Sequence, residues 1–496
     1  LDAHTLPELM GRRYQSKFIQ VFSGLMIFIF MPIYAGVVLI GGCEFITSHF
    51  GVDYDAALLV FSVIIAVYVI AGGLKAVMYT DALQGTIMMV AMALLLIFTY
   101  CKLGGVTRAH TDLTGLAAIV PANLKAIGHQ GWTAMPKFGW GSNSYNLWWF
   151  VISTLTLGVG IGCLAQPQLS VRFMTVKSQR ELNRAVMLGG LFIILIPGAA
   201  YIVGSLSNNF NTQFGPVIQG KITRVVDAQK KQVFALMLKK DAEGKISEVL
   251  DKAGQPMEIP LVVSDEKPRL AEGDVVNGRT ISIVDAGGNA GLVIPNFIKR
   301  AMPAWFGLLF MLTLLSAAMS TLSGQFHALG TAASRDVFEQ FTSRKDASVR
   351  VTKIGIIIGI VASVIIAHYC RYGTFIARGT AIFFGLCAAA FMPAFVGGLF
   401  FKRMTKAAAL WSMVTGFTVS AFWLVFIKAK EAGDIGIVQK FTGGKPSLLF
   451  DYPNWPEVDP IIIALPIAAV VAIVVSIVTK PNDEKHLKLC FDGPNA

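Results

Sequence analysis

Ten stretches of the chain are apolar over a length that suits a helix crossing a lipid bilayer. An α-helix needs about 20 apolar residues to span the hydrocarbon layer, and inside that layer only helices and closed barrels satisfy every backbone polar group. Since 54% of the residues are hydrophobic and 15% are charged, we predict an all-α polytopic membrane protein whose partner is the lipid bilayer. The stretches are residues 18–43, 56–74, 82–101, 145–171, 185–206, 304–334, 354–370, 379–401, 407–427 and 460–479.

The formal net charge of +12 follows the loops between these stretches. With one long loop left aside, one set of alternate loops carries about twice as many Lys and Arg residues as the other set, and the positive-inside rule places the richer set in the cytoplasm. This topology predicts a multi-pass protein of the cytoplasmic membrane with both ends of the chain in the cytoplasm, and no nucleic-acid partner. The six cysteines show neither a disulfide framework nor the spacing of metal ligands.

The long loop at residues 216–286 differs from the rest of the chain because it is rich in charges of both signs. Short apolar runs, separated by Gly, Asp and Lys, predict a small soluble β-rich module outside the cytoplasm. We therefore expect transmembrane helices in 1–215, this insert in 216–286, further transmembrane helices in 287–480 and a cytoplasmic tail in 481–496. The predicted strands lie in the runs at 221–226, 233–238, 259–263 and 279–284.

Adjacent hydroxyls at Ser320 and Thr321 stand near the middle of residues 304–334, which contain no formally charged residue. Helical periodicity places the Ala317 carbonyl one turn before both hydroxyls. Three hard oxygen atoms then converge in the way that a small cation such as sodium requires. The alternative is that both hydroxyls donate to carbonyls of the preceding turn, as Ser and Thr often do in membrane helices.

Residues 71–84, AGGLKAVMYTDALQ, join the second and third predicted helices. Two glycines permit a tight turn there, and Asp81 follows Thr80 at the start of the next helix, where a carboxylate favours the positive end of the helix dipole. Helix capping alone would account for Asp81 equally well.

Four motifs of the chain resemble those of the sodium:solute symporter family and occur in the same order. This family includes sodium-coupled glucose, proline, pantothenate and monocarboxylate transporters. Any one of them would be a weak signal, whereas four in the expected order are specific. LPELMGRRY at residues 6–14 is similar to an inner loop of the same family. The four motifs are GGLKAVxxTDxLQ from residue 72, QPxxxVRFM from 166, SAAMSTLSGQFHALGTAASRDVF from 316 and FMPAFVGGLFFKRMTKAAALWSMVTG from 391.

The resemblance implies a LeuT-like fold of two inverted five-helix repeats, with substrate and sodium bound near the membrane midplane where helices are broken. It assigns core helices 3 to 7 to residues 1–215, and core helices 8 to 10 plus two trailing helices to residues 287–480. It also implies that this chain lacks about three N-terminal helices. Sodium is then the coupling ion, and no other cofactor is expected.

The same resemblance assigns the sodium ligands to the Ser320 and Thr321 hydroxyls and the Ala317 carbonyl. Asp81 matches a family carboxylate implicated in cation passage, and Ser323 could join it in a second cation site. Gly324, however, lacks the hydroxyl that two-sodium members tend to carry at that position. One sodium ion per transport cycle is therefore expected.

The candidate substrate residues lie around QPQ at 166–168. Val159 and Cys163 stand where proline-type members carry Trp and Tyr, so a proline pocket of that kind is not expected. Gln166 and Gln168 flank a proline that frees a carbonyl within the helix, which suits either a substrate gate or a simple packing kink. His327 faces the same side of its helix as Ser320, and it either meets a carboxylate substrate or a proton, or is a core histidine.

Together these features predict sodium-coupled secondary active symport of a small organic solute by alternating access, with a monocarboxylate or a small amino acid favoured. The alternative is a membrane sensor or receptor that binds a ligand through residues 216–286. An enzyme is not expected, because the sequence shows no catalytic triad, HExxH motif or paired carboxylates at membrane depth.

Overall fold

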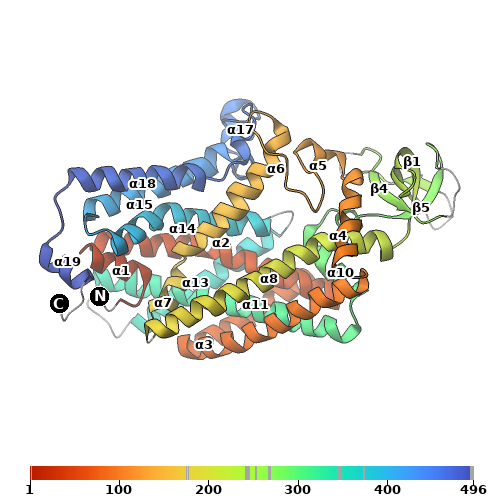
Figure 1. Ribbon diagram of the computed structural model, residues 1–496. Coiled ribbons are helices and arrows are strands. Elements are labelled where there is room, and N and C mark those ends of the chain that lie inside the picture. Colours follow the sequence, from red (N-terminus) through yellow and green to blue (C-terminus); the bar gives the residue numbers. More distant parts are fainter. Residues whose placement is uncertain are drawn as a thin grey trace.

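The structure, a computed structural model, describes the chain except residues 2, 175, 177, 241–245, 252–253, 266–269, 343–347, 372–374 and 492–496, and except the side chains of residues 73–77, 240 and 246. Within the described part, ten helices are long and apolar enough to cross a membrane. They match the ten predicted segments one for one, so the prediction of ten spans is confirmed. The long helices run between two ends of the molecule, with both termini at one end and the β-sheet at the other (Figure 1).

The long helices form the transmembrane bundle, and the short ones lie at its two ends. The long helices are α2 (Lys17–Phe50), α3 (Tyr54–Lys102), α8 (Gln179–Phe214), α11 (Ala304–Thr331), α13 (Ser348–Tyr369), α14 (Phe375–Phe400), α15 (Lys406–Phe422) and α18 (Ile461–Val478). The short α-helices are α1 (Leu6–Arg13), α4 (Val106–Gly115), α5 (Ala122–Ala126), α6 (Asn146–Trp149), α7 (Pro167–Met174), α9 (Ser282–Asp285), α10 (Val293–Ala301), α12 (Glu339–Phe341), α16 (Ala429–Ile435), α17 (Ile437–Thr442) and α19 (Glu484–Phe491). Three π-helical segments are η3 (Phe150–Ile161), η6 (Ala332–Phe338) and η8 (Trp423–Ile427).

Helix boundaries follow local capping chemistry. The Ser16 side chain accepts a hydrogen bond from the Ile19 amide at the start of α2, which ends at Gly51 in the left-handed conformation (φ 67°). Ser178 and Thr405 cap α8 and α15 in the same way as Ser16. Such side chains satisfy amides that have no partner within the helix, and glycine adopts the left-handed conformation at little cost.

The two helices predicted at 56–74 and 82–101 are two candidate spans, Tyr54–Gly72 and Met78–Lys102, but the helical backbone runs through the predicted turn between them, so both belong to α3. The chain nevertheless bends there, because the Tyr68 and Thr80 hydroxyls are hydrogen-bonded although they lie 12 residues apart. In a straight α-helix that separation is about 18 Å. The bend therefore brings the two halves of α3 together, while the side chains of 73–77, part of the predicted turn, lie outside those described.

Helix α14 is the most buried of the ten candidate spans, and α8 is the least buried. The α14 residues Phe383 and Phe391 are fully enclosed and pack with residues of α1, α2 and α15 in the largest hydrophobic core cluster. Helix α11 packs between α2, α3 and α13. Because α8 exposes large apolar side chains such as Met187 and Ile194, its outer face suits contact with lipid.

The insert forms a small β-sheet that closes on itself. Strand β1 pairs with both β2 and β5, β4 pairs with β2 and β5, and β3 adds to the edge of β2, with all pairings antiparallel. Ile222, Val233, Ile259 and Leu261 fill its interior. The strands are β1 (Ile218–Asp227), β2 (Gln232–Lys240), β3 (Ile246–Glu248), β4 (Glu258–Val263) and β5 (Val275–Arg279).

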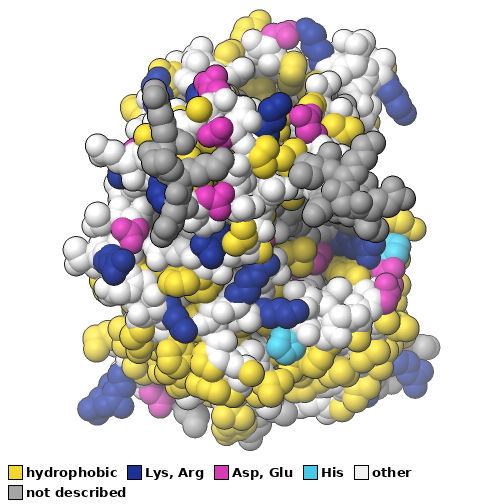
Figure 2. Space-filling model, turned by 90° about the vertical axis from the view of Figure 1, so that its right-hand side faces the viewer, with side chains coloured by type: hydrophobic (Ala, Val, Ile, Leu, Met, Phe, Trp, Pro, Cys, Tyr) yellow, Lys and Arg dark blue, Asp and Glu magenta, His cyan; other side chains and the backbone are white. Residues whose placement is uncertain are grey.

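Three of the four predicted strand runs lie in β1, β2 and β4, but the fourth, at 279–284, was wrong. Strand β5 ends at Arg279, and Ser282 begins the short helix α9. The Asn208 side chain at the end of α8 accepts hydrogen bonds from the Ser282 amide (3.2 Å) and hydroxyl (2.8 Å). This distant contact fixes the chain where local alternation had predicted a strand. Figure 2 looks onto this end, where side chains of both charges are scattered above a hydrophobic band.

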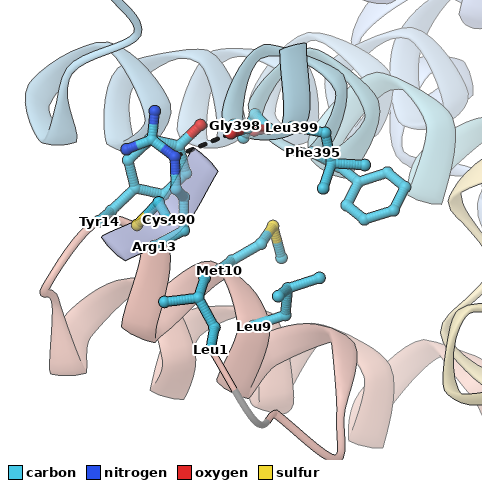
Figure 3. A pocket seen from close by; sticks show the side chains of 10 residues that line it. Leu1, Leu9, Met10, Arg13, Tyr14, Phe395, Gly398, Leu399 and Cys490 are labelled. Carbon is cyan, nitrogen blue, oxygen red and sulfur yellow. Dashed lines mark hydrogen bonds between the residues drawn. The ribbon is translucent and has the colours of Figure 1, made fainter. Parts of the chain in front are cut away.

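At the opposite end, α1 is anchored to α14 by two hydrogen bonds. Arg13 donates from Nε to the Gly398 carbonyl (2.8 Å), and the Tyr14 hydroxyl donates to the Ala394 carbonyl (2.6 Å). Figure 3 shows Arg13 reaching Gly398 beside a cavity of about 50 Å³ lined mainly by apolar side chains such as Met10. A space of this size holds about one or two water molecules, so it is too small for an organic solute.

The close approach of α14 and α15 gives a testable packing prediction. A Cβ added at Gly416 would lie 2.0 Å from the Ala389 carbonyl oxygen, whereas one added at Gly41 would meet nothing within 4 Å. We expect Gly416→Ala to destabilise the protein by about 1–3 kcal/mol because a packed interface cannot admit an extra methyl group. Thermal unfolding of the detergent-purified protein measures the effect. Gly41→Ala is the matched control and should leave stability unchanged or slightly higher; equal losses in both variants would contradict the prediction.

Candidate functional site

The fourth candidate span, Asn143–Ala165, does not continue into α7 as one helix. Its π-helical part η3 (Phe150–Ile161) leads through Gly162 and a short 3-10 turn to Gln166, whose backbone is extended (φ −73°, ψ 124°). Helix α7 then begins at Pro167, because proline has no N–H to continue the preceding helix and suits a first helical position. The predicted single segment 145–171 is thus a broken helix rather than a kinked one.

Polar side chains gather at the break. Gln166 is fully buried; it donates weakly to the Gly162 carbonyl (3.4 Å) and accepts from Gln168 Nε2 (3.0 Å). The Gln168 Oε1 atom is buried without a hydrogen-bond partner. A buried polar atom without a partner is uncommon in native proteins and marks a place where water, an ion or a solute can bind.

On α11, neither Ser320 nor Thr321 donates to the preceding turn among the hydrogen bonds of the described residues. Ser323 does donate, from Oγ to the Ser320 carbonyl (3.0 Å), and so does Thr313, to the Leu309 carbonyl (2.8 Å). The back-bonding alternative therefore describes Thr313 and Ser323 but not the Ser320 and Thr321 pair. The Ser320 side chain instead interacts with a carboxyl of another helix, that of Asp81.

Asp81 of α3 lies beside this part of α11. The Ser320 side chain is close enough to interact with the Asp81 carboxyl, although Asp81 Oδ1 is buried and forms no hydrogen bond of normal geometry. The other oxygen, Oδ2, pairs with Nη2 of Arg172 in α7 at 2.6 Å. The structure thus brings the predicted cation residues Asp81 and Ser320 together, while Ser323 contacts Ser320 within α11.

A cavity of about 260 Å³ adjoins these residues at the junction of α1, α3, α7 and α11. Gln168 and Arg172 line it from α7, and Gly324 and His327 line it from α11. The His327 Nε2 atom is buried without a hydrogen-bond partner. The volume suits a small organic molecule or a few waters, and the polar lining includes two guanidinium groups (Arg172 and Arg335), the Gln168 amide and two imidazoles (His4 and His327).

The remaining two substrate candidates lie elsewhere. Val159 and Cys163 pack against the core cluster around α14 and do not line this cavity. Gly162, between them and the break, is in tight contact with α14, since an added Cβ would lie 2.6 Å from Cβ of Phe384. Of the five substrate candidates, Gln168 and His327 therefore line the cavity. Val159 and Cys163 pack against the hydrophobic core, and Gln166 lies at the helix break.

Two polar residues of this region were not predicted from the sequence. Arg172 lies within the QPxxxVRFM motif, but nothing local indicates its pairing with Asp81, 91 residues earlier. Gln325 is fully buried, and both of its side-chain polar atoms lack a partner. An amide in the middle of an uncharged span is itself a signal of function. Within the described residues, no cluster of three His, Cys, Asp or Glu side chains suits a metal ion.

Ten apolar helices, one of them broken at a polar centre that adjoins a cavity, define a multi-pass helical membrane protein. The model of the sodium:solute symporter family matches residues 1–238 and 274–416. The chain belongs to the sodium:solute symporter family. The predicted fold class, an all-α LeuT-like membrane fold with a small β-rich insert, is confirmed.

Three similar proteins illustrate the relationship. The chain is 23% identical over 443 residues to the osmoregulated proline transporter OpuE of Bacillus subtilis, covering 89% of this chain and 72% of that protein. It is 32% identical over 193 residues to a sodium/proline symporter of Staphylococcus aureus, covering 38% of this chain and 33% of that protein. A sodium/pantothenate symporter of Haemophilus influenzae is 27% identical over 205 residues, 41% of this chain and 39% of the relative.

A solved structure of a Na⁺-coupled sialic acid symporter is similar in fold. It matches with a TM-score of 0.60 at 15% identity, and the match covers 97% of this chain and 78% of that one. The two proteins therefore share an architecture across nearly the whole of this chain.

Proposed function

We propose that the protein is a sodium-coupled symporter that moves a small organic solute across the cytoplasmic membrane by alternating access. The observation that carries the proposal is the broken helix at Gln166, whose second half lines one cavity together with α11. Broken helices near the midplane expose backbone and side-chain polar groups that ions and solutes can bind. Membership of a family of sodium-coupled transporters supports the same conclusion.

Sodium would bind to the Ser320 and Thr321 hydroxyls and the Ala317 carbonyl. Hydroxyl and carbonyl oxygens are hard ligands of the kind that hard cations prefer. This assignment is supported by the hydrogen bonds of α11. Thr313 and Ser323 donate to carbonyls of the preceding turn, whereas Ser320 and Thr321 do not. Sodium is the coupling ion in this proposal, and no other cofactor takes part.

Coupling requires that sodium favour one conformation over the other. A ligand shifts a conformational equilibrium only through its different affinity for the two states, and by linkage the solute then raises the affinity for sodium by the same factor. The Ser320 and Thr321 ligands lie on α11, which packs against the bent α3 and lines the same cavity as α7. A movement between α11 and these two elements would therefore change the sodium site and the solute cavity together.

The substrate class that fits best is a small monocarboxylate or a small amino acid. Arg172 and His327 offer groups that can bind a carboxylate, and Gln168 offers an unpartnered amide oxygen to a donor such as an ammonium group. The relatives' names, which include proline and pantothenate, describe solutes that carry a carboxylate. The excess of basic residues at the loops on the side of the termini favours that side as cytoplasmic.

The test is uptake by the full-length protein in proteoliposomes. With an inward sodium gradient, we expect accumulation of radiolabelled L-proline, L-alanine, lactate or pyruvate, because sodium entry drives the solute; an equal potassium gradient should drive none. A sodium gradient collapsed beforehand is the control for passive leakage. Solute flux that is identical with sodium and potassium would contradict the proposal. Ligand binding to residues 216–286 without any flux would favour a receptor instead.

A further inference from the structure

An apolar groove of about 540 Å³ lies between α14 and α18, away from the solute cavity. It opens on the outside of the bundle, because Phe401, Ile473 and Ile477 line it and are all exposed. Its inner wall includes the small buried residues Gly397 and Ala472. The volume lies within the range of sites that bind small ligands.

The groove has about the length of one leaflet of a bilayer. On α18 it extends from Leu465 to Ile477, and about twelve helical residues rise about 18 Å. One leaflet contributes about 15 Å of hydrocarbon. The groove ends where α14 and α18 both stop, at the end of the bundle that carries the termini (Figure 1). The proposed function places this end in the cytoplasm, so the groove faces the cytoplasmic leaflet.

Arg403 lines the groove at this end. Its Nη2 atom donates to the carbonyls of Ile477 (3.0 Å) and Thr479 (2.9 Å) at the end of α18, which holds the guanidinium in place. No carboxylate of the described residues forms an ion pair with Arg403. The permanent positive charge and planar fork of arginine suit a phosphate group.

The surroundings of Arg403 are basic. The loop after α14 lies against the end of α18, because the Thr405 and Thr479 hydroxyls are hydrogen-bonded to each other (2.7 Å). The two acids that follow α18 are matched by two lysines, and these four residues are Asp483, Glu484, Lys485 and Lys488. The excess of positive charge comes from exposed lysines close to Arg403 and Thr479 in the sequence, which are Lys402, Lys406 and Lys480.

We propose that this groove binds one anionic phospholipid of the cytoplasmic leaflet, with an acyl chain between α14 and α18 and the phosphate at Arg403. Anionic lipids are attracted to basic residues at the cytoplasmic surface, and basic pockets between transmembrane helices bind their headgroups. A packed helix would fill the apolar part of the groove but would bring no phosphate to Arg403. The inference takes only the orientation of the chain from the proposed function and does not depend on the solute.

The test is lipid binding by the full-length protein in detergent, measured by native mass spectrometry. The probes are phosphatidylglycerol and phosphatidylcholine with the same acyl chains. We expect the wild type to bind one phosphatidylglycerol more tightly than phosphatidylcholine. Arg403→Gln should weaken the binding of phosphatidylglycerol about tenfold or more, because hydrogen bonds between charged groups are lost, and should remove most of the preference.

Arg180→Gln is the matched control. Arg180 is also an exposed arginine, but it lies at the start of α8 and does not line the groove. This variant should keep the wild-type affinity for phosphatidylglycerol. Equal losses in the two variants would overturn the inference, since general attraction between basic residues and anionic lipid would then explain the binding. Equal binding of the two lipids by the wild type would also overturn it.

Ala469→Phe provides a second test, which does not depend on the folding of the Arg403 variant. Ala469 is a half-buried wall residue of the groove, and a phenyl ring there should displace part of the acyl chain. We expect both lipids to bind about tenfold more weakly, the loss that about two uncovered CH₂ groups produce. Unchanged binding would overturn the inference. So would a wild-type protein that binds no lipid, as expected if a helix or a second copy covers the groove. Sodium-driven uptake is a separate measurement, so these failures would leave the proposed function intact.

Discussion

Replacing both Ser320 and Thr321 by alanine is expected to abolish sodium-driven uptake. Each hydroxyl that contacts an ion contributes about 1.5–3 kcal/mol, so the loss of both should lower the apparent sodium affinity by about 100-fold or more. The effect follows because neither oxygen is engaged by the preceding turn of α11. Initial uptake rates across a series of sodium concentrations measure it.

Thr313→Ala is the control for this variant, since the Thr313 hydroxyl lies on the same helix but donates to the Leu309 carbonyl. It should retain wild-type sodium dependence. Uptake that stays sodium-dependent with unchanged affinity in the Ser320→Ala/Thr321→Ala protein would remove the sodium assignment. The broken helix would then still stand as the candidate solute site, because its geometry does not depend on these hydroxyls.

The largest effect on stability is expected at a buried ion pair on the sheet-bearing side. Nζ of Lys428 lies 2.7 Å from Oδ2 of Asp459, and their side chains are 4% and 1% exposed. Burial alone lowers the pKa of Lys428, but the neighbouring carboxylates of Asp459 and Glu431 outweigh it and the pKa is raised. Lys428 is therefore charged in the folded protein, and it also contacts the Thr154 hydroxyl of η3.

Asp459→Ala should cost about 3–5 kcal/mol, because it leaves a buried charge without its partner. Thermal unfolding in detergent measures the loss. Asp451→Ala is the matched control, because it breaks the Lys445–Asp451 pair. In that pair the Lys445 side chain is 47% exposed and the Asp451 side chain is 62% exposed. An exposed pair contributes about 0–1 kcal/mol. Similar losses in the two variants would show that burial does not set the contribution of the Asp459 pair.

The ten spans could be predicted from the sequence because the bilayer imposes a length and a polarity on each of them. The break at Gln166 was partly predictable, since Pro167 interrupts the hydrogen bonds of a helix. The π-helical form of η3 was not predictable, because its apolar residues suit an α-helix equally well. The same holds for α3, where two glycines indicated a bend but not that the helix continues through it.

In the candidate site, too, some residues could be predicted from the sequence and others could not. Ser320, Thr321 and Asp81 stood out as polar residues in apolar surroundings, which is a local property of the sequence. The contact between Asp81 and Arg172 depends on how α3 and α7 pack, and no local pattern encodes it. The misassigned strand at 279–284 has a similar cause, since the Asn208 side chain, far away in sequence, decides where α9 begins.

The closed sheet of the insert enters and leaves the bundle at neighbouring points. Ile218 near its start is paired with Gly278 near its end, and paired residues of antiparallel strands have Cα atoms about 5 Å apart. The family model leaves out residues 239–273, which lie inside this insert. A short turn could therefore replace the whole sheet without moving α8 or α10. We therefore expect an affinity tag or a fluorescent label inserted within residues 239–273 to leave the transmembrane helices in place.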